Sequence, residues 1–451
     1  MSRSACRAPS RRRLVRFAAA IAVAAAVVTA LPRAAAAQAP SREMLSRGHR
    51  MLAQIYKDLR EIYFDQTFGG VDLEARYRAA DSAITAAPTN NHIIAAAAQF
   101  VSELNDSHTR FYPPGHVANV DYGYQTTFVG DTCFITLVKA NSDAAAKGVR
   151  RGDVLLKVDA FPAERASFPT VEYVYHSLSP RTLVRLTLRS PDGAQRTVDV
   201  ASKVTRRERT TDYTDVETWR RLYDEADTTV IVVHRWIEIG DSVMVWRMSQ
   251  FAGSDKSNID DLMKKVGSRR ALVLDLRDNG GGALVTLEYL LGHFFDQEVT
   301  IGAQRSRDGT KPWVVKPRSK APYRGMVVVL LNSASASSSE IFARTMQLEG
   351  RAVIVGDRSR GAVVGSRIFP HLVGAGLEGR SLEYATQISV LDVVMPDGQR
   401  LEGVGVTPDH VVLPTAADIA ARRDPQMAKA LELVGMQVSP ESAGTMFRAR
   451  R

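Results

Sequence analysis

The spacing of apolar residues predicts a helical region near the beginning of the chain. Apolar residues recur every three to four positions in three stretches, at about 44–62, 72–86 and 91–104. Gly69-Gly70 and Pro88 separate these stretches, as residues that interrupt helices do. We therefore expect three helices that form a small unit of their own.

The pattern changes twice along the rest of the chain. Residues 118–204 contain short β-type runs between turns, which predicts a small β-rich domain. From residue 205 to 415 the strand-like runs, such as 271–276 and 326–331, are apolar without interruption, and they alternate with helical segments. Strands of this kind are buried on both faces, so the largest region is expected to form an α/β core.

The first 37 residues have the pattern of an export signal. Arginines up to Arg16 precede an apolar run from Phe17 to Leu31, and Ala35-Ala36-Ala37 offers the small residues that a signal peptidase needs. The apolar run is shorter than the roughly 20 residues that a membrane span needs, which disfavours the alternative of a retained anchor. Residues 10–16 also resemble a twin-arginine motif. We expect an exported protein, periplasmic or secreted, with no stable membrane span after cleavage.

Composition and charge exclude several classes of protein. The chain has 451 residues, of which 45% are hydrophobic and 24% charged, as in an ordinary globular protein with more than one domain. Its net charge is +10, but residues 1–37 hold seven arginines and no acidic residue, and only +3 remains without them. No nucleic-acid partner is expected on this basis. Without Cys6 the mature chain keeps only Cys133, in a β-type run, so we expect a core thiol and no internal disulfide. The sequence has no metal-site motif, and neither a metal nor another cofactor is expected.

Residues 142–163, SDAAAKGVRRGDVLLKVDAFPA, resemble part of a PDZ domain. Their pattern predicts a short helix that ends at Gly148, a turn and a strand. The resemblance implies a module that binds an extended chain end by strand addition and captures its carboxylate with backbone N–H groups. The candidate peptide-binding residues are Gly123, Tyr124 and Gln125, in the phrase Tyr122-Gly123-Tyr124-Gln125. The alternative is a small β domain used only for packing.

A glycine-rich turn in the α/β region is the first candidate for chemistry. The phrase DLRDNGGG at 275–282 precedes a helix predicted over 283–295. Glycines that open a helix expose backbone N–H groups, which suit a phosphate or an oxyanion equally well. Neither GxGxxG nor GxxxxGK[ST] is present, which speaks against phosphate.

A serine-rich turn is the second candidate. The phrase NSASASSSE at 332–340 follows the predicted strand 326–331 and opens a helix predicted over 338–348. A serine there lies at the carboxyl end of a strand, where α/β folds place their ligands. The alternative is purely structural, because Ser337 and Glu340 also fit the S-x-x-E capping box.

Taken together, these phrases resemble the C-terminal processing, or tail-specific, serine peptidases and their tricorn-like relatives. The matching phrases are DLRDNGGG, NSASASSSEIFARTMQ, GRAVIVGD and LEGVGVTPD. The resemblance implies an α/β fold class, with a crotonase-like α/β core, an inserted PDZ-like β domain and an N-terminal helical region. It also implies that Ser337 is the nucleophile and that the N–H groups of Gly281 and Ser338 form the oxyanion hole.

The patterns along the chain divide it into five parts, two of which take their names from the resemblance. These are a signal peptide at 1–37, an N-terminal helical region at 38–117, a PDZ-like domain at 118–204, a serine peptidase core at 205–415 and a C-terminal tail at 416–451.

One departure from the family changes the expected mechanism. The processing peptidases use a Ser–Lys dyad, but Ala362 occupies the lysine position in Ser359-Arg360-Gly361-Ala362. No lysine occurs from residue 321 to 428. A methyl group cannot accept a proton, so the serine needs another base.

The tricorn-like branch supplies such a base. Its histidine follows a serine, as His108 follows Ser107, and its acid lies in an E-x-x-G-V-x-P-D phrase that begins here at Glu402. The resemblance implies that His108 is the general base and that Ser107 and Glu402 orient its ring. The alternatives are a structural His108, a surface Glu402, and His116 as a competing base.

The expected function is therefore that of an exported serine peptidase of Ser-His-Glu type. It would cleave polypeptides near C-termini that the PDZ-like domain recruits. The alternative is a catalytically inactive binding or scaffold protein on the same fold, which the missing lysine suggests. A crotonase-type acyl-CoA enzyme is a weaker alternative, because the export signal and the PDZ-like region speak against it. The expected partner is a polypeptide substrate, and the sequence indicates no oligomeric state.

Overall fold

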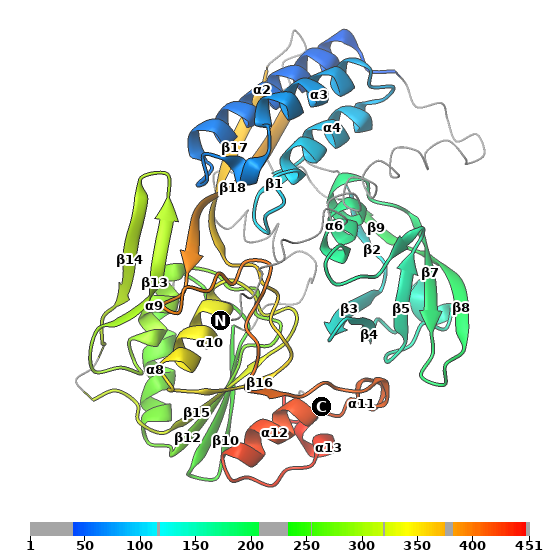
Figure 1. The fold of residues 1–451 in the computed structure, drawn as a ribbon. Coiled ribbons are helices and arrows are strands. Elements are labelled where there is room, and N and C mark those ends of the chain that lie inside the picture. Colours follow the sequence, from blue (N-terminus) through cyan, green and yellow to red (C-terminus); the bar gives the residue numbers. More distant parts are fainter. Residues whose placement is uncertain are drawn as a thin grey trace, which may run out of the picture.

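The structure is a computed structural model that describes residues 39–114, 118–206, 233–253, 255–318, 321–374 and 382–447. The export pattern at 1–37 and His116 lie outside these residues. Figure 1 shows a helical unit at the top, a β-rich unit at the right and an α/β core at the lower left. In the part of the chain that is described, no helix is both long and apolar enough to cross a membrane.

The N-terminal unit consists of the three helices that the apolar spacing predicts. They and a short 3-10 turn are α2 (Arg42–Ile62), η2 (Phe68–Gly70), α3 (Leu73–Thr85) and α4 (Asn90–Ser102). Helix α2 begins after Ser41, whose hydroxyl accepts the N–H of Met44 at 3.1 Å, as an N-cap residue does. The apolar faces of the helices share one core with three strands of the neighbouring sheet.

That neighbouring sheet connects the helical unit to the core. Its strands are β1 (Arg110–Tyr112), β13 (Val299–Ser306), β14 (Gly309–Val315), β17 (Val364–Val373) and β18 (Leu382–Val394). The order is β1-β18-β13-β14, and β17 also pairs with β18. Strand β18 pairs with β1 at Gln387 and with β13 at Val394. One long strand therefore joins β1, which follows the helical unit, to β13 of the core. The segment just before β1 is thereby held against the core.

The β-rich unit forms a sheet of its own. Its elements are β2 (Ala118–Asp121), β3 (Tyr124–Val129), β4 (Thr132–Val138), α5 (Asp143–Ala146), β5 (Val154–Val158), β6 (Phe161–Pro162), α6 (Phe168–Tyr173), η3 (Val174–Leu178), β7 (Leu183–Arg189), β8 (Gln195–Ala201) and β9 (Lys203–Arg206). The order β3-β4-β5-β7-β8 places β3 at one edge. Helix α6 packs beside that edge, because the Phe128 and Phe168 rings lie 5.7 Å apart.

Cys133 lies inside this unit, as predicted. It is 1% exposed, on β4. Burial raises the pKa of its thiol to about 12, so the group is a protonated core thiol at neutral pH.

The α/β core is built on a mostly parallel sheet. Its elements, apart from those already given, are β10 (His234–Ile239), β11 (Val243–Met248), α8 (Lys256–Gly267), β12 (Ala271–Asp275), α9 (Leu284–Leu291), β15 (Met326–Leu331), α10 (Ser338–Leu348), β16 (Val353–Gly356), β19 (His410–Val411), α11 (Ala416–Ala421), α12 (Pro425–Leu433) and α13 (Pro440–Ala443). The order is β10-β11-β12-β15-β16-β19, parallel except for the antiparallel pair β10–β11.

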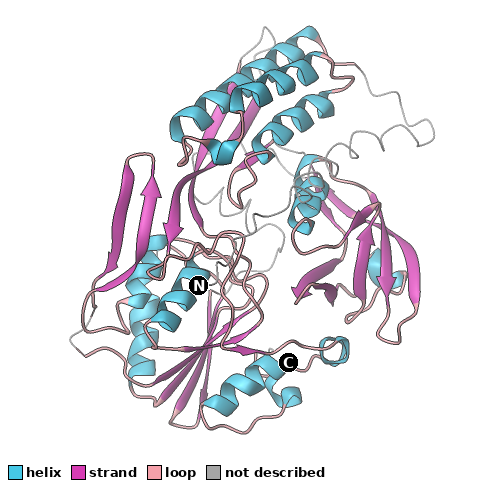
Figure 2. Cartoon of the chain, viewed as in Figure 1, coloured by secondary structure: helices cyan, strands magenta, loops and turns pink. Residues whose placement is uncertain are grey.

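Alternate residues of the parallel strands face two separate hydrophobic cores. Leu272 and Leu274 pack with residues of α8, α9 and α10, whereas Val273 and Val328 pack with residues of α12. Figure 2 shows helices on both sides of this sheet. Burial on both faces explains why the strand sequences are apolar without interruption, and it confirms the predicted α/β arrangement.

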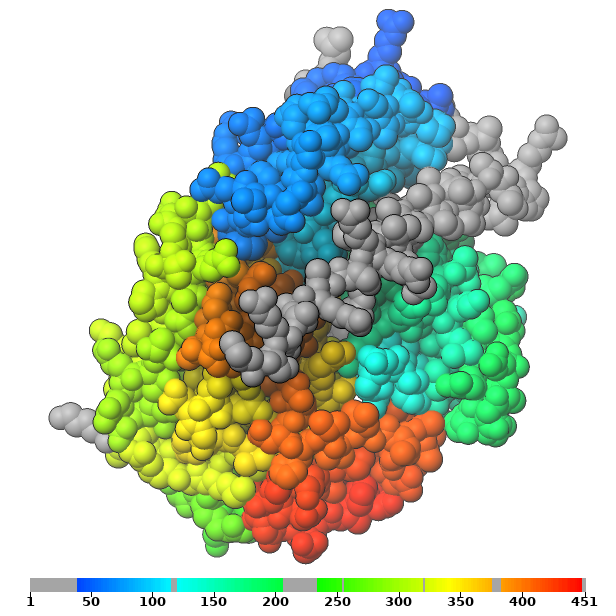
Figure 3. Space-filling model, in the orientation of Figure 1, coloured from blue at the N-terminus to red at the C-terminus, as the bar shows by residue number. Residues whose placement is uncertain are grey.

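Two helical regions differ from the sequence-based expectation. Helix α10 spans the predicted residues, but α9 ends at Leu291 with Gly292 as its C-cap, four residues before the predicted end. A Cβ at Gly292 would lie only 2.6 Å from the Lys316 carbonyl oxygen, so the segment after β14 packs closely there. Residues 416–443, assigned to a tail from the sequence, form three helices on the sheet, at the end of the molecule opposite the helical unit in Figure 3.

One buried ion-pair network joins these C-terminal helices to the glycine-rich turn. Arg277 binds Asp275 at 2.8 and 2.9 Å and Asp424, the N-cap of α12, at 2.8 and 2.9 Å. The Asp275 side chain is 0% exposed. A buried carboxylate of this kind depends on its cation, because removal of one partner leaves an uncompensated charge.

We expect Arg277→Met to lower the free energy of unfolding by about 3–5 kcal/mol, as the loss of a buried ion-pair partner does. Arg185→Met is the matched control, because Arg185 and Asp199 form a similar two-bond pair with side chains that are 63% and 44% exposed. Urea denaturation measures both variants. An Arg277 variant as stable as the Arg185 variant would contradict a role for the buried network.

Candidate active site

Ser337 has a strained backbone at the turn between β15 and α10. Its φ is 55° and its ψ is −118°, a conformation that non-glycine residues rarely adopt. Other N-cap residues of the chain, such as Ser41 (φ −67°) and Thr415 (φ −78°), have ordinary extended backbones. Helix capping therefore does not account for the conformation of Ser337. A serine on a sharp, strained strand-to-helix turn is typical of hydrolytic nucleophiles.

The Glu340 carboxylate holds this turn from below. It accepts the N–H groups of Ser337 (2.9 Å), Gly361 (2.7 Å) and Ala362 (2.9 Å) and the Ser359 hydroxyl (2.5 Å). Burial raises the pKa of Glu340, and these four hydrogen bonds oppose that rise. Glu340 thus belongs to a capping box, as predicted, but it also joins the serine turn to the segment 359–362.

The glycine-rich turn lies directly against the serine turn. Gly281 has φ 100°, and a Cβ there would lie 2.6 Å from the Ser337 Cβ, so no other residue fits without a shift. Its N–H donates to Asn279 Oδ1 at 2.9 Å. The Ser338 N–H, by contrast, has no acceptor within the described residues, and it opens helix α10. Of the two expected oxyanion donors, Ser338 is thus available, whereas Gly281 must share its proton with Asn279.

Ser107, His108 and Glu402 form a chain of hydrogen bonds between segments almost 300 residues apart in sequence. The Ser107 hydroxyl lies 2.6 Å from His108 Nδ1 and donates to Glu402 Oε2 at 2.9 Å. The Ser107 N–H donates to Glu402 Oε1 at 2.8 Å. The carboxylate therefore binds Ser107 twice, and Ser107 in turn binds the imidazole.

This chain fixes the tautomer of the imidazole. A serine hydroxyl carries one proton, and the Ser107 hydroxyl uses that proton in its hydrogen bond to Glu402. Its oxygen must then accept a proton from His108, so Nδ1 of His108 carries the hydrogen. Nε2 is left with a lone pair, which is what a general base requires.

A short segment, residues 359–363, connects Ser337 to the hydrogen-bonded group Ser107, His108 and Glu402. The Ser337 N–H donates to the Ala362 carbonyl at 2.9 Å, and the Val363 N–H donates to Glu402 Oε2 at 2.7 Å. The Gly403 N–H donates to the Gly361 carbonyl at 2.8 Å. Ala362, at the lysine position of the family, thus contributes backbone groups to the site. Within the described residues the Ser337 hydroxyl has no hydrogen bond to His108, and the backbone of this segment is what connects the two candidates.

Asp106 presents His108 and was not identified from the sequence. Its Oδ1 accepts the N–H groups of His108 at 2.8 Å and Thr109 at 2.6 Å, and the Ser389 hydroxyl at 2.9 Å. Its Oδ2 accepts the Thr109 hydroxyl at 2.7 Å. Asp106 accepts the N–H of the second residue after it, as in an Asx turn, and an aspartate at this spacing from His108 is a signal that could have identified it.

Burial and nearby charges keep His108 neutral. Burial lowers its pKa to about 4, Asp106 opposes the change, and the charges of Arg110 and Arg360 lower the pKa further. Burial also raises the pKa of Glu402, against its hydrogen bonds from Val363 and Ser107. At neutral pH the imidazole is therefore unprotonated and able to accept a proton.

The candidate peptide-binding residues lie at the edge of the β-rich unit. Tyr124 and Gln125 are on β3, the edge strand. The Gly123 N–H already donates to Asp121 Oδ1 at 2.8 Å, and its carbonyl accepts the Lys139 N–H at 2.9 Å. β3 thus has a neighbouring strand on one side only within the described sheet, whereas the Gly123 N–H is engaged within the loop.

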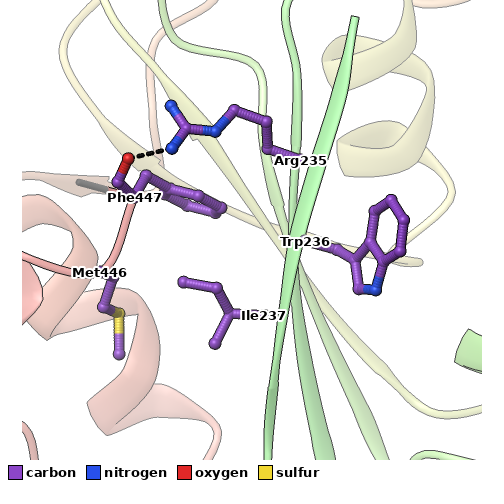
Figure 4. A pocket seen from close by; sticks show the side chains of 5 residues that line it. All are labelled: Arg235, Trp236, Ile237, Met446 and Phe447. Atoms are coloured by element: carbon purple, nitrogen blue, oxygen red, sulfur yellow. Dashed lines mark hydrogen bonds between the residues drawn. The ribbon is translucent and has the colours of Figure 1, made fainter. Parts of the chain in front are cut away.

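An open surface pocket of about 300 Å³ lies elsewhere, at the edge strand β10. Figure 4 shows the five residues that line it and the hydrogen bond from Arg235 to the Phe447 carbonyl. None of them is a candidate site residue. Within the described ranges, no cluster of three or more His, Cys, Asp or Glu side chains is arranged to hold a metal ion.

Comparison with known proteins supports the resemblance seen in the sequence. Residues 242–412 match the family described as Peptidase family S41. The carboxyl-terminal-processing protease of Picosynechococcus sp. is 28% identical over 342 residues, which cover 72% of this chain and 74% of that protein. The protein of the same name from Synechocystis sp. is 29% identical over 211 residues, 45% of this chain and 47% of that protein. The resemblance to C-terminal processing serine peptidases is thereby confirmed, and these matches do not distinguish the tricorn-like branch.

Two solved structures share the fold. Mature CPAF aligns with a TM-score of 0.63 at 16% identity, over 84% of this chain and 94% of that one. The photosystem II D1 C-terminal processing protease aligns with a TM-score of 0.52 at 16% identity, over 88% and 99% of the two chains. The chain therefore shares the mixed helix and sheet fold of these two proteins.

We expect the His108 ring protons to titrate with a midpoint of about 4, because burial and the two arginines disfavour the imidazolium. NMR of histidine-labelled protein measures this midpoint, and His108→Asn assigns the resonance. Arg360→Gln removes one of the charges and should move the midpoint upward. A midpoint near the ordinary histidine value of about 6.5 would contradict the described environment.

We expect Glu340→Gln to destabilise the protein, because one amide oxygen cannot satisfy four donors and its NH₂ group faces donors. Each donor left unsatisfied costs about 1–3 kcal/mol, so a loss of at least that size is expected in urea denaturation. Glu349→Gln, at the exposed other end of α10, is the control and should have little effect. Equal stabilities of the two variants would contradict the role assigned to Glu340.

Proposed function

We propose that this protein is a serine peptidase that cleaves polypeptides through an acyl-enzyme intermediate, with Ser337 as nucleophile and His108 as base. The observation that carries the proposal is the hydrogen-bond chain Glu402–Ser107–His108, which leaves Nε2 of the imidazole unprotonated. The strained backbone of Ser337 at the head of α10 supports it independently.

The proposed reaction follows from these positions. Nε2 of His108 takes the hydroxyl proton of Ser337 while the Ser337 Oγ bonds to the substrate carbonyl carbon. The electron pair of the carbonyl double bond moves onto the carbonyl oxygen. The Ser338 N–H, and the Gly281 N–H as it is released from Asn279, stabilise that oxyanion. When the electron pair returns, the C–N bond breaks and His108 gives its proton to the leaving amine. Water then hydrolyses the acyl-serine ester by the same sequence of proton transfers.

Ser107 and Glu402 act on the ring and not on the substrate. Their chain holds Nδ1–H in place, and the Glu402 charge stabilises the imidazolium that forms after proton transfer. The lysine of the Ser–Lys dyad is not needed, because the imidazole takes over its task. The relatives' names, carboxyl-terminal-processing proteases, support a peptidase.

The finer parts of the proposal concern recruitment and location. The β-rich unit is PDZ-like, and the outer edge of β3 with Tyr124 and Gln125 would bind an extended substrate tail by strand addition. The core is crotonase-like. The pattern of residues 1–37 supports export to the periplasm or beyond it.

A fluorophosphonate probe tests the proposal, because it reacts only with an activated serine. We expect stoichiometric labelling of Ser337, no labelling of Ser337→Ala, and strong reduction in His108→Ala. Peptide hydrolysis should fall by about 10⁴-fold or more in either variant, as for other residues that act as a catalytic unit.

Ser333→Ala is the matched control, because the Ser333 hydroxyl lies in the same turn but donates to the Phe128 carbonyl at 2.5 Å. It should be labelled like the unmodified protein. A folded protein that is not labelled would overturn the proposal and favour the inactive binding protein.

A further inference from the structure

Two arginines flank the candidate catalytic residues, and the proposed reaction uses neither. Arg110 lies two residues after His108, at the start of β1. Arg360 lies in the segment between Ser359 and Gly361, both of which donate to Glu340. The backbone of Arg110 is therefore held next to His108, and the backbone of Arg360 is held next to the residues that bind Glu340.

Neither side chain is buried in a hydrophobic core. On β1 only Phe111 is buried, in the core of the helical unit, so Arg110 points to the opposite side of the strand. The Arg360 N–H donates to the Ser335 carbonyl at 2.9 Å, which holds its backbone beside the serine turn, and its side chain is exposed.

The β-rich unit contacts the chain next to each arginine. The Tyr173 hydroxyl donates to the Phe111 carbonyl, one residue from Arg110. The Arg165 guanidinium donates to the Ser359 carbonyl at 3.1 Å, one residue from Arg360. The last residue of α6 and a residue just before α6 thus bind the backbone next to the two arginines.

Neither arginine has a hydrogen bond or ion pair through its guanidinium within the described residues. Most arginines of the core are paired, as Arg277 is with Asp275 and Asp424. Glu172 of α6 carries a countercharge that acts on both: burial raises the pKa of its carboxyl group, and the charges of Arg360 and Arg110 oppose that rise. The pKa of Arg360 is lowered by desolvation and by the charge of Arg110, so the two cations disfavour each other.

Two unpaired guanidinium groups that repel each other are a site for an anion, because a planar guanidinium binds a carboxylate through two parallel hydrogen bonds. We propose that Arg110 and Arg360 bind a carboxylate of the substrate next to Ser337, and so make the enzyme selective for acidic polypeptide segments. The carboxylate is that of an acidic side chain or of the chain terminus. This inference rests on the proposed function and names its substrate class.

The site also affects the base. The charges of Arg110 and Arg360 lower the pKa of His108. A bound carboxylate neutralises these charges, so it makes the imidazole a better proton acceptor at the time when substrate is present. A neutral substrate leaves the base weaker.

Binding to the Ser337→Ala protein tests the proposal without hydrolysis. The probe is a fluorescent peptide with no other acidic residue, made with Glu or Gln near its end and with a free or an amidated terminus. We expect a carboxylate form to bind about tenfold to a hundredfold more tightly than the neutral peptide in fluorescence anisotropy, as for hydrogen bonds to charged groups. The form that carries this preference, side chain or terminus, identifies the source of the carboxylate.

Variants separate the site from general charge. Arg110→Gln and Arg360→Gln should each reduce the preference, and the double variant should abolish it. Arg358→Gln is the matched control in the same segment, because its side chain is 49% exposed and lies 3.7 Å from Asp131. Glu172→Gln removes the competing carboxylate and should strengthen binding of the acidic peptide only.

Equal binding of all peptides, no binding of any, or a preference that persists in the double variant would overturn the proposal. Failure of the proposed function is a separate result, since fluorophosphonate labelling measures the serine and not the arginines. A labelled enzyme that cleaves neutral and acidic peptides equally well would retain the function and refute the selectivity.

Discussion

The carboxylate of Glu340 is the constraint on which the site depends. It is completely buried and accepts four hydrogen bonds, from the Ser337 N–H, the Ser359 hydroxyl and the backbone of Gly361 and Ala362. A buried carboxylate is stable only when its oxygens receive hydrogen bonds. The serine turn and the segment 359–362 must therefore keep one relative arrangement. The strain in the Ser337 backbone persists because this arrangement over-determines it.

The segment 359–363 carries that constraint to the other half of the site. From Ser359 to Ala362 it faces Glu340, and at Val363 it donates to Glu402. Two carboxylates from different parts of the sequence therefore bind one short segment, on the nucleophile side and on the imidazole side. The structure needs no lysine at position 362 for this purpose, because the backbone of Ala362 makes the connection.

Much of the fold could be predicted from the sequence, because its signals are local. The three N-terminal helices, the buried parallel strands and the bounds of α10 follow from periodicity and capping residues. The end of α9 could not be predicted, since it depends on a distant segment that packs against Gly292. The candidate site divides in the same way. Ser337, His108 and Glu402 could be named because they lie in recognisable phrases. The hydrogen bonds from Ser359, Gly361 and Ala362 to Glu340, and the one from Ser389 to Asp106, could not, because hydrogen bonds between segments far apart in sequence leave no local pattern.

The C-terminal helices have a consequence for where the core can be cut. Residues of α12 cover one face of the sheet, and Asp424 and Gln426 accept three of the five hydrogen bonds that the Arg277 guanidinium donates. A fragment that stops at residue 415 would bare the apolar side of β12 and β15 to water and leave a guanidinium short of acceptors. Such a piece would aggregate sooner than fold, so an expressed core has to include α12 and α13.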